Sequence, residues 1–287
     1  MFRKSLVAAC LLLLSMNVQS ADWTGTMKKV NDAKRFVIGY TPDAAPLSFE
    51  NDSGEAVGYS VELCRRIAAA VKRELSLDQM QIDYAPLVSP QDRMDAVING
   101  DVDIECGAST VTLSRRAKVD FTLMTLVTGA SVLAKKESGI ASTADLSGKS
   151  IAVIKGTTTE AALNKFLQTN LFDAEVLTAD THEAGVALLN EGKVDAYASD
   201  QIMLVGQIIQ AEDKSAYALA RDVFSFEPYG FMVRKDDSQF RLVADRALAQ
   251  LYRSAAIQRL YHTWFGRFGI EPSPVLKAMY QFQGLPD

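Results

Sequence analysis

The chain has 287 residues, of which 48% are hydrophobic, so it is long enough to bury a sizeable core in one or two domains. Its formal net charge of −5 provides no basic footprint for nucleic acid, and no nucleic-acid partner is expected. The sequence contains neither a His-Glu-x-x-His motif nor a cysteine or histidine cluster. We therefore expect no metal ion and no other cofactor.

Residues 1–20 have the pattern of a secretory signal peptide. Arg3 and Lys4 form its charged region, an apolar segment runs from Leu6 to Met16, and the small residue Ser20 precedes the expected cleavage. The apolar segment is too short to span a membrane. We therefore expect a soluble mature chain that is exported to the periplasm.

Predicted strands and helices alternate along the mature chain, which favours an α/β fold with mostly parallel sheets flanked by helices. Ser89 and Pro90 are a typical cap and first turn, and Asp180 with Glu183 predicts a capping box for a helix that ends near Gly192. The other predicted elements are strands at 36–40, 102–105, 150–154, 174–177 and 194–198, and helices at 60–73, 156–167, 239–254 and 256–265.

The two halves of the chain resemble each other, because 96–104 and 187–197 each combine an amphipathic helix, a glycine and a strand. Two similar lobes would direct their strand-end loops toward one cleft. The extended segments 121–134 and 224–233 are predicted to cross between the lobes, as in hinge-bending proteins. The resulting organisation is lobe 1 at 36–127 plus 229–270, lobe 2 at 132–225 and a C-terminal extension at 271–287.

Two segments have the chemistry of an anion site. Small and hydroxyl residues follow the strand at 102–105, and Arg115 lies five residues after Thr110. A strand-end loop can direct N–H groups at a carboxylate, which an arginine holds with two parallel bonds. Thr157, Thr158 and Thr159 open a helix, where free N–H groups also attract an anion. Read alone, these residues are equally consistent with a surface arginine and an ordinary helix cap.

These segments resemble the amino-acid-binding proteins of ABC importers, solute-binding protein family 3, and most closely the glutamate/aspartate-binding branch. The resemblance covers nearly the whole mature chain and is carried by the motifs Asp103-Ile104-Glu105-Cys106-Gly107, Gly156-Thr157-Thr158-Thr159-Glu160, Asp180-Thr181-His182, Ala198-Ser199-Asp200 and Glu227-Pro228-Tyr229-Gly230. It implies a two-lobe periplasmic binding protein fold of type II. It also implies a monomeric receptor that captures a polar amino acid by cleft closure, glutamate or aspartate being favoured, and delivers it to an inner-membrane ABC permease.

The resemblance also implies roles for individual residues. Arg115 and Thr110 match the positions that hold the ligand α-carboxylate, with Thr157 and Thr158 at the helix start. Asp200 matches the aspartate that holds the ammonium group. Arg93 and His182 match residues that reach a distal carboxylate. The alternatives are a solvated Arg115, helix-capping roles for Asp200 and the threonines, an Arg93 tied to Asp92, and a loop histidine.

The chain departs from the branch at its distal pocket. Thr41 stands where the branch has a second distal arginine, so one expected cation is missing. Ala108 replaces a serine, although its backbone N–H remains for the ligand, and Pro90 replaces another serine. The amino-acid clamp is therefore expected to be intact. A different polar amino acid or a related carboxylate competes with glutamate and aspartate as the ligand.

Two other functions are compatible with the sequence, and the cysteines allow two states. An exported enzyme on this fold, similar to cyclohexadienyl or arogenate dehydratases, would use Glu105, His182 and Asp200 as acid–base groups. A ligand-presenting sensor protein would need a partner, because the chain carries no kinase or cyclase of its own. Cys64 and Cys106 are expected to be separate buried thiols, with a disulfide as the alternative after export.

Overall fold

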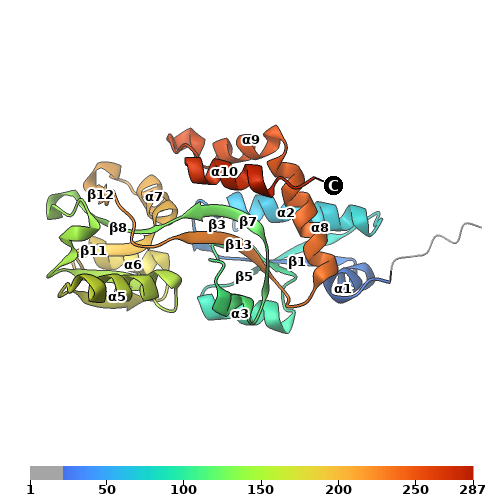
Figure 1. The fold of residues 1–287 in the computed structure, drawn as a ribbon, viewed down its shortest axis with the longest axis horizontal. Helices are drawn as coiled ribbons and strands as arrows, with labels where there is room; N and C mark the ends of the chain where they lie inside the picture. Colours follow the sequence, from blue (N-terminus) through green and yellow to red (C-terminus); the bar gives the residue numbers. More distant parts are fainter. Residues whose placement is uncertain (1–21, 287) are drawn as a thin grey trace, which may run out of the picture.

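The structure is a computed structural model that describes residues 22–286, and the predicted signal peptide lies outside the described residues. The chain forms two lobes, each built on a five-stranded sheet that helices cover (Figure 1). The two sheets share one plan, in which the fourth strand is antiparallel to both of its neighbours and the first three are parallel. The expected α/β fold of two similar lobes is confirmed.

Lobe 1 contains both ends of the described chain. Its sheet has the order β5-β1-β6-β13-β7, with a small sheet β2-β3-β4 beside it. The strands are β1 (Arg35–Tyr40), β2 (Asp43–Ala44), β3 (Ser48–Glu50), β4 (Ala56–Val57), β5 (Gln81–Pro86), β6 (Ile104–Glu105), β7 (Asp120–Thr128) and β13 (Glu227–Val233). The helices are α1 (Gly25–Ala33), α2 (Tyr59–Glu74), α3 (Pro90–Asn99), α4 (Leu113–Arg116), α8 (Ser238–Tyr252), α9 (Ala255–Trp264) and α10 (Pro274–Gln283).

Lobe 2 is formed by one continuous stretch of chain. Its sheet has the order β10-β9-β11-β8-β12. The strands are β8 (Ala130–Lys135), β9 (Ser150–Ile154), β10 (Glu175–Ala179), β11 (Ala196–Asp200) and β12 (Tyr217–Leu219), and the helices are α5 (Thr158–Asn170), α6 (His182–Asn190) and α7 (Gln201–Gln210). Because β6 and β11 hold the same place in the two sheets, Glu105 and Asp200 lie at equivalent strand ends.

Local sequence signals explain where the helices begin. Ser89 and Asp92 form the capping box of α3, Pro90 is its first residue, and Gly100 follows its end with φ at 76°. The predicted capping box of α6 is wrong. Thr181 is the cap there, and its Oγ1 accepts from the Ala184 N–H at 3.0 Å, so the helix begins one residue later than Asp180 implied.

The two crossings lie side by side at the centre of the molecule (Figure 1). β7 continues through Gly129 into β8, and β13 pairs antiparallel with β7 from Glu227 opposite Thr128. These paired strands connect the two sheets. A pair of strands that share hydrogen bonds bends as a unit, which is the connection that a hinge requires.

Cys64 and Cys106 form a disulfide, so the expectation of separate buried thiols is wrong. Cys64 lies on the buried face of α2, and Cys106 directly follows β6. Their Cα atoms are 6.3 Å apart, within the usual range for a disulfide. The bond therefore ties the start of the Glu105–Arg115 segment to the main helix of lobe 1.

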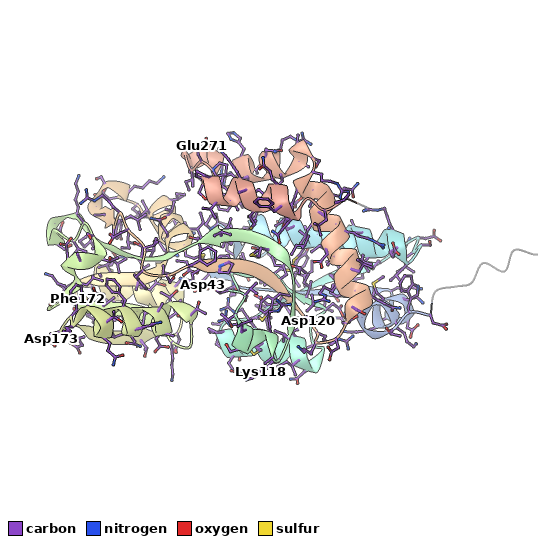
Figure 2. All side chains as sticks on the ribbon, in the orientation of Figure 1. Asp43, Lys118, Asp120, Phe172, Asp173 and Glu271 are labelled. Atoms are coloured by element: carbon purple, nitrogen blue, oxygen red, sulfur yellow. A yellow bond between two sulfur atoms is a disulfide. The ribbon has the colours of Figure 1, made fainter. Side chains whose placement is uncertain are left out.

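The lobes touch each other across the cleft. Asp43 of lobe 1 lies where the lobes meet (Figure 2), and its Oδ2 accepts from the His182 N–H of lobe 2 at 2.7 Å. A Cβ at Gly206 of α7 would lie 2.1 Å from the Ala45 carbonyl oxygen of lobe 1, so a glycine is required at this contact. None of the described helices is long and apolar enough to cross a membrane.

Candidate functional site

A cleft lies between the lobes and is lined by residues of both. It brings together every residue that the sequence predicted for the ligand site, from both lobes. These residues are Thr41, Arg93, Ala108, Thr110, Arg115, Thr157, Thr158, His182 and Asp200. Residues far apart in the chain thus converge on one volume, as the equivalent strand ends of the two sheets require.

Arg115 provides a cation at one wall of the cleft. It lies on α4, where Thr112 caps the helix by accepting from the Arg115 N–H at 3.1 Å. Its Nη1 donates to the Thr110 carbonyl oxygen at 2.9 Å. Burial lowers the pKa of Arg115, and the nearby Arg93 acts in the same direction. Since a guanidinium has five N–H donors, the bond to Thr110 leaves most of them for an anion.

Asp200 provides an anion from the opposite lobe. It ends β11 and stands at the cap position of α7, but its side chain makes no capping bond. Its carboxylate accepts instead from the Tyr229 hydroxyl and from Thr159 Oγ1, the latter at 2.8 Å. Burial, together with the nearby Glu227, raises the pKa of Asp200 to about 6, and the hydroxyls of Tyr229 and Thr159 oppose this shift. The capping alternative for Asp200 is therefore wrong.

The start of α5 forms a second wall of the cleft. Thr157 Oγ1 accepts from the Glu160 N–H at 3.1 Å and donates to the Ile154 carbonyl at 2.7 Å, so this hydroxyl is used in capping. The first N–H groups of a helix have no acceptor within the helix and favour an anion. Thr157 therefore presents only its backbone N–H to the cleft, whereas Thr158 also presents its hydroxyl.

One carboxylate lies between the two walls. Glu227 Oε2 accepts from Thr110 Oγ1 at 2.6 Å and from Thr158 Oγ1 at 2.9 Å. Glu227 Oε1 accepts from Ser225 Oγ at 2.6 Å. Thr110 and Thr158 belong to different lobes, and their hydroxyl oxygens lie 3.2 Å apart. The hydroxyls of Thr110 and Thr158, both bonded to Glu227, thus connect the two lobes beside the cleft.

The far end of the cleft contains buried charges whose hydrogen-bonding capacity is unmet. Arg93 is 8% exposed; its Nη1 donates to Thr41 Oγ1 at 3.3 Å and its Nε has no partner. Glu105 Oε1 accepts from the Gly107 N–H at 2.8 Å, and its Oε2 has no partner. A Cβ at Gly107 would lie 2.3 Å from Glu105 Oε1 and 2.5 Å from Thr41 Oγ1, so these groups are packed around a glycine.

His182 lies at the same end, on the lobe 2 side. Its Nδ1 is 2.7 Å from the Tyr197 hydroxyl. Burial lowers the pKa of His182 to about 4, Arg93 lowers it as well, and Asp43 opposes the shift. The ring is therefore neutral at neutral pH. When Nδ1 accepts from Tyr197, the neutral ring carries its proton on Nε2 and is a hydrogen-bond donor.

Several polar residues in or beside the cleft were not predicted from the sequence. Tyr229 and Glu227 belong to a motif that supported the resemblance, but neither received a role. Asp43 and Asp180 line the cleft as well, and the Asp43 carboxylate accepts from the His182 N–H. Asp180 belonged to the Asp180-Thr181-His182 motif but was read only as a helix cap, whereas a single aspartate such as Asp43 is typical of any protein surface. The predicted tie between Arg93 and Asp92 does not form, since Asp92 caps α3.

The chain is similar in sequence to a known family of proteins. The profile of bacterial extracellular solute-binding proteins, family 3, matches residues 36–267. The L-glutamate/L-aspartate-binding protein of Pseudomonas aeruginosa is 33% identical over 254 residues, which cover 88% of this chain and 84% of that protein. The glutamate/aspartate import solute-binding protein of Escherichia coli is 30% identical over 268 residues, which cover 92% of this chain and 88% of that protein.

A solved structure supports the same assignment at the level of the fold. A periplasmic binding protein of an ABC transporter from Brucella ovis, with glutathione bound, superposes with a TM-score of 0.75 at 24% identity. The match covers 90% of this chain and 79% of that one. The sequence profile, the two relatives and the fold agree with the resemblance found in the sequence. The chain belongs to family 3 of the bacterial extracellular solute-binding proteins.

Proposed function

We propose that the chain is the periplasmic receptor of an amino-acid ABC importer and that it is a monomer. One observation carries the proposal: Arg115 and Asp200, of opposite charge, face one cleft from different lobes. An α-amino acid carries an anion and a cation on one carbon, so its carboxylate fits Arg115 and the N–H groups of α5, while its ammonium fits Asp200. A ligand held in this way closes the lobes, and an inner-membrane permease receives the loaded form.

Glutamate and aspartate are the ligands that we propose first. They are named for both relatives, and Arg93 with a donor on His182 suits a distal carboxylate. The amides glutamine and asparagine are the second candidates. Asp43 and Asp180 line the cleft, and Thr41 stands where the resemblance expects a cation, so the distal end has acceptors for an amide nitrogen.

The hydrogen bonds of the three candidate acid–base groups fit a protein that binds its ligand without converting it. Glu105 is bonded to the Gly107 N–H, His182 is bonded to Tyr197, and Asp200 accepts from Tyr229 and Thr159. Protein groups thus hold all three residues in fixed positions. The named relatives are binding proteins, and we propose the same role for this chain.

A thermal-shift screen of the mature protein against the amino acids tests the proposal, with calorimetry on every compound that stabilises it. A ligand at a hundred times its dissociation constant stabilises the fold by about 2.7 kcal/mol. Arg115→Ala is the control. It should bind none of these ligands while it unfolds at the wild-type temperature in their absence, because losing one partner of a desolvated charge pair costs about 2–5 kcal/mol. Near-wild-type affinity in this variant would remove Arg115 from the site.

A further inference from the structure

Glu227 is buried behind Thr110 and Thr158, which line the cleft, yet the proposed amino-acid clamp gives it no role. It is the first residue of β13, pairs with Thr128 of the other crossing, and is 2% exposed. Among residues 22–286 its carboxylate forms no ion pair. The hydroxyls of Thr110, Thr158 and Ser225 are its partners instead.

These bonds depend on the closed arrangement of the lobes. Thr110 is held to lobe 1 through its bridge with Tyr229, and Thr158 is the first residue of α5 in lobe 2. Both hydroxyls reach the same atom, Glu227 Oε2. Opening of the cleft would move Thr158 away from Thr110, and one of the two bonds would break. The bond that joins Glu227 to the opposite lobe therefore stabilises the closed form alone.

The same bonds fix the direction of two protons. A threonine hydroxyl has one proton, and an ionised carboxylate can only accept. Thr110 and Thr158 therefore donate their protons to Glu227, which leaves the lone pairs of both oxygens for a ligand. A carboxylate of the ligand cannot donate a hydrogen bond to these two oxygens, whereas the ammonium of a ligand has three N–H groups. These two hydroxyls thus suit the ammonium of an α-amino acid, and its carboxylate is left to Arg115 and the backbone of α5.

We propose that Glu227 is the closure latch of the cleft, a positioning residue that joins a threonine from each lobe and turns both hydroxyl oxygens toward the ligand ammonium. The second half of this statement rests on the proposed function, because it takes an α-amino acid as the ligand. It places the Thr110 hydroxyl beside the ligand ammonium, whereas the resemblance implied a place beside the α-carboxylate. Thr110 remains a residue of the site, but its hydroxyl faces the ammonium of the ligand and not its α-carboxylate.

The test is a double-mutant cycle on binding kinetics, with L-glutamate and L-glutamine as probes. Stopped-flow fluorescence compares wild type, Glu227→Ala, Thr158→Val and the double variant. We expect Glu227→Ala to raise the dissociation rate about tenfold or more, the loss typical of a hydrogen bond to a charged group. The association rate should change less, because the latch forms on closure. The two effects should be less than additive in the double variant, since both changes remove the bond between Glu227 and Thr158.

Two further variants separate the latch from a general disturbance of the hinge. Ser225→Ala removes the hydroxyl on the other carboxylate oxygen and touches neither threonine, so its dissociation rate should remain at the wild-type value. Glu227→Gln keeps an acceptor oxygen without the charge and should fall between wild type and Glu227→Ala. It also replaces Glu227→Ala in the cycle when that variant fails to fold by circular dichroism.

Wild-type dissociation in Glu227→Ala, additive effects in the cycle, or an equal effect of Ser225→Ala would overturn the latch. A wild type that binds no amino acid would overturn the proposed function instead. In that case small-angle scattering of the ligand-free proteins tests the latch separately from the proposed function. Glu227→Ala should then have a larger radius of gyration than wild type and Ser225→Ala, and equal radii in all three would overturn the latch.

Discussion

Arg93 and Arg115 are both arginines of the cleft, but their surroundings give them different tasks. Arg115 is half-buried and bonded to a backbone carbonyl, whereas Arg93 is almost fully buried and lacks a partner for its Nε. A buried guanidinium with an unmet donor is costly unless a ligand supplies an acceptor. The distal end of the cleft is therefore incomplete until an acceptor group enters it.

This difference predicts how ligand selectivity changes. In a competition titration of glutamate against glutamine, and of aspartate against asparagine, Arg93→Ala should weaken the acids by about 2–5 kcal/mol. The amides lose only a bond of about 0.5–1.5 kcal/mol. Arg115→Ala is the matched control and should weaken acids and amides alike, since both carry the same α-carboxylate. An acid-to-amide ratio that Arg93→Ala leaves unchanged would contradict the acidic ligand.

Asp200 predicts the pH dependence of binding. Burial raises its pKa to about 6. A ligand ammonium favours the ionised carboxylate, so the pKa of Asp200 must be lower in the complex. Affinity should therefore be constant well above pH 6 and fall as the pH drops below 6, with release of a proton on binding. Calorimetry in two buffers of different ionisation enthalpy measures that proton.

The control for this pH dependence is Asp200→Asn, which should bind weakly with little change between pH 7 and pH 5. His182 should not contribute over this range, because its pKa is lowered to about 4 and its ring stays neutral. Constant affinity of the wild type between pH 7 and pH 5 would exclude Asp200 as the ammonium partner.

At the level of single residues, the sequence predicted which positions line the cleft better than it predicted what they do. Arg115 and Asp200 follow strand ends, and strand order places them correctly. The partners of Asp200, by contrast, come from α5 and β13, which are distant in sequence. The bonds of Glu227 join residues of both lobes, and such contacts leave no periodic pattern in the sequence.

Among the elements, the segment from β6 to α4 depends most on its support. The disulfide joins Cys106, directly after β6, to Cys64 on α2 across 42 residues of sequence. Reduction of the wild type, or a Cys64→Ala/Cys106→Ala double variant, should lower the free energy of unfolding by about 2–5 kcal/mol. Ligand affinity should fall too, because Gly107, Ala108 and Thr110 follow the lost anchor.

Chemical denaturation with and without a reducing agent measures this loss, and calorimetry of the reduced protein measures the affinity. The double variant treated with the same reducing agent is the control, because it has no disulfide to lose and should not respond. Equal unfolding midpoints for the oxidised and reduced wild type would show that packing alone holds this segment.

Some elements with a buried face were predicted well, whereas other elements were missed. Val61, Leu63, Ile67 and Val71 mark the buried side of α2, which begins and ends within one residue of the prediction. β5 was missed, because it is a half-exposed edge strand that includes polar residues and a proline. α10 was only named as an extension, although Leu276, Met279 and Tyr280 bury one of its faces.

For the whole molecule, the paired crossings predict closure about a hinge. Small-angle scattering with saturating ligand should give a smaller radius of gyration than without ligand, because the clamp groups lie on opposite lobes. Arg115→Ala with the same compound is the control and should keep the radius of the ligand-free protein. A wild-type radius that ligand leaves unchanged would mean that binding does not depend on lobe movement.

The insertion of lobe 2 into lobe 1 has a consequence for the order in which the protein can fold. In the sheet of lobe 1, β6 and β7 are both bonded to β13, which follows the whole of lobe 2 in the chain. Because the polypeptide is made from its N-terminus onward, all strands of lobe 2 are present before β13 is. During that time one edge of β6 is without its neighbour. An unpaired strand edge invites association with other chains. Lobe 1 is therefore the part of the nascent protein that most needs protection until its last strand arrives.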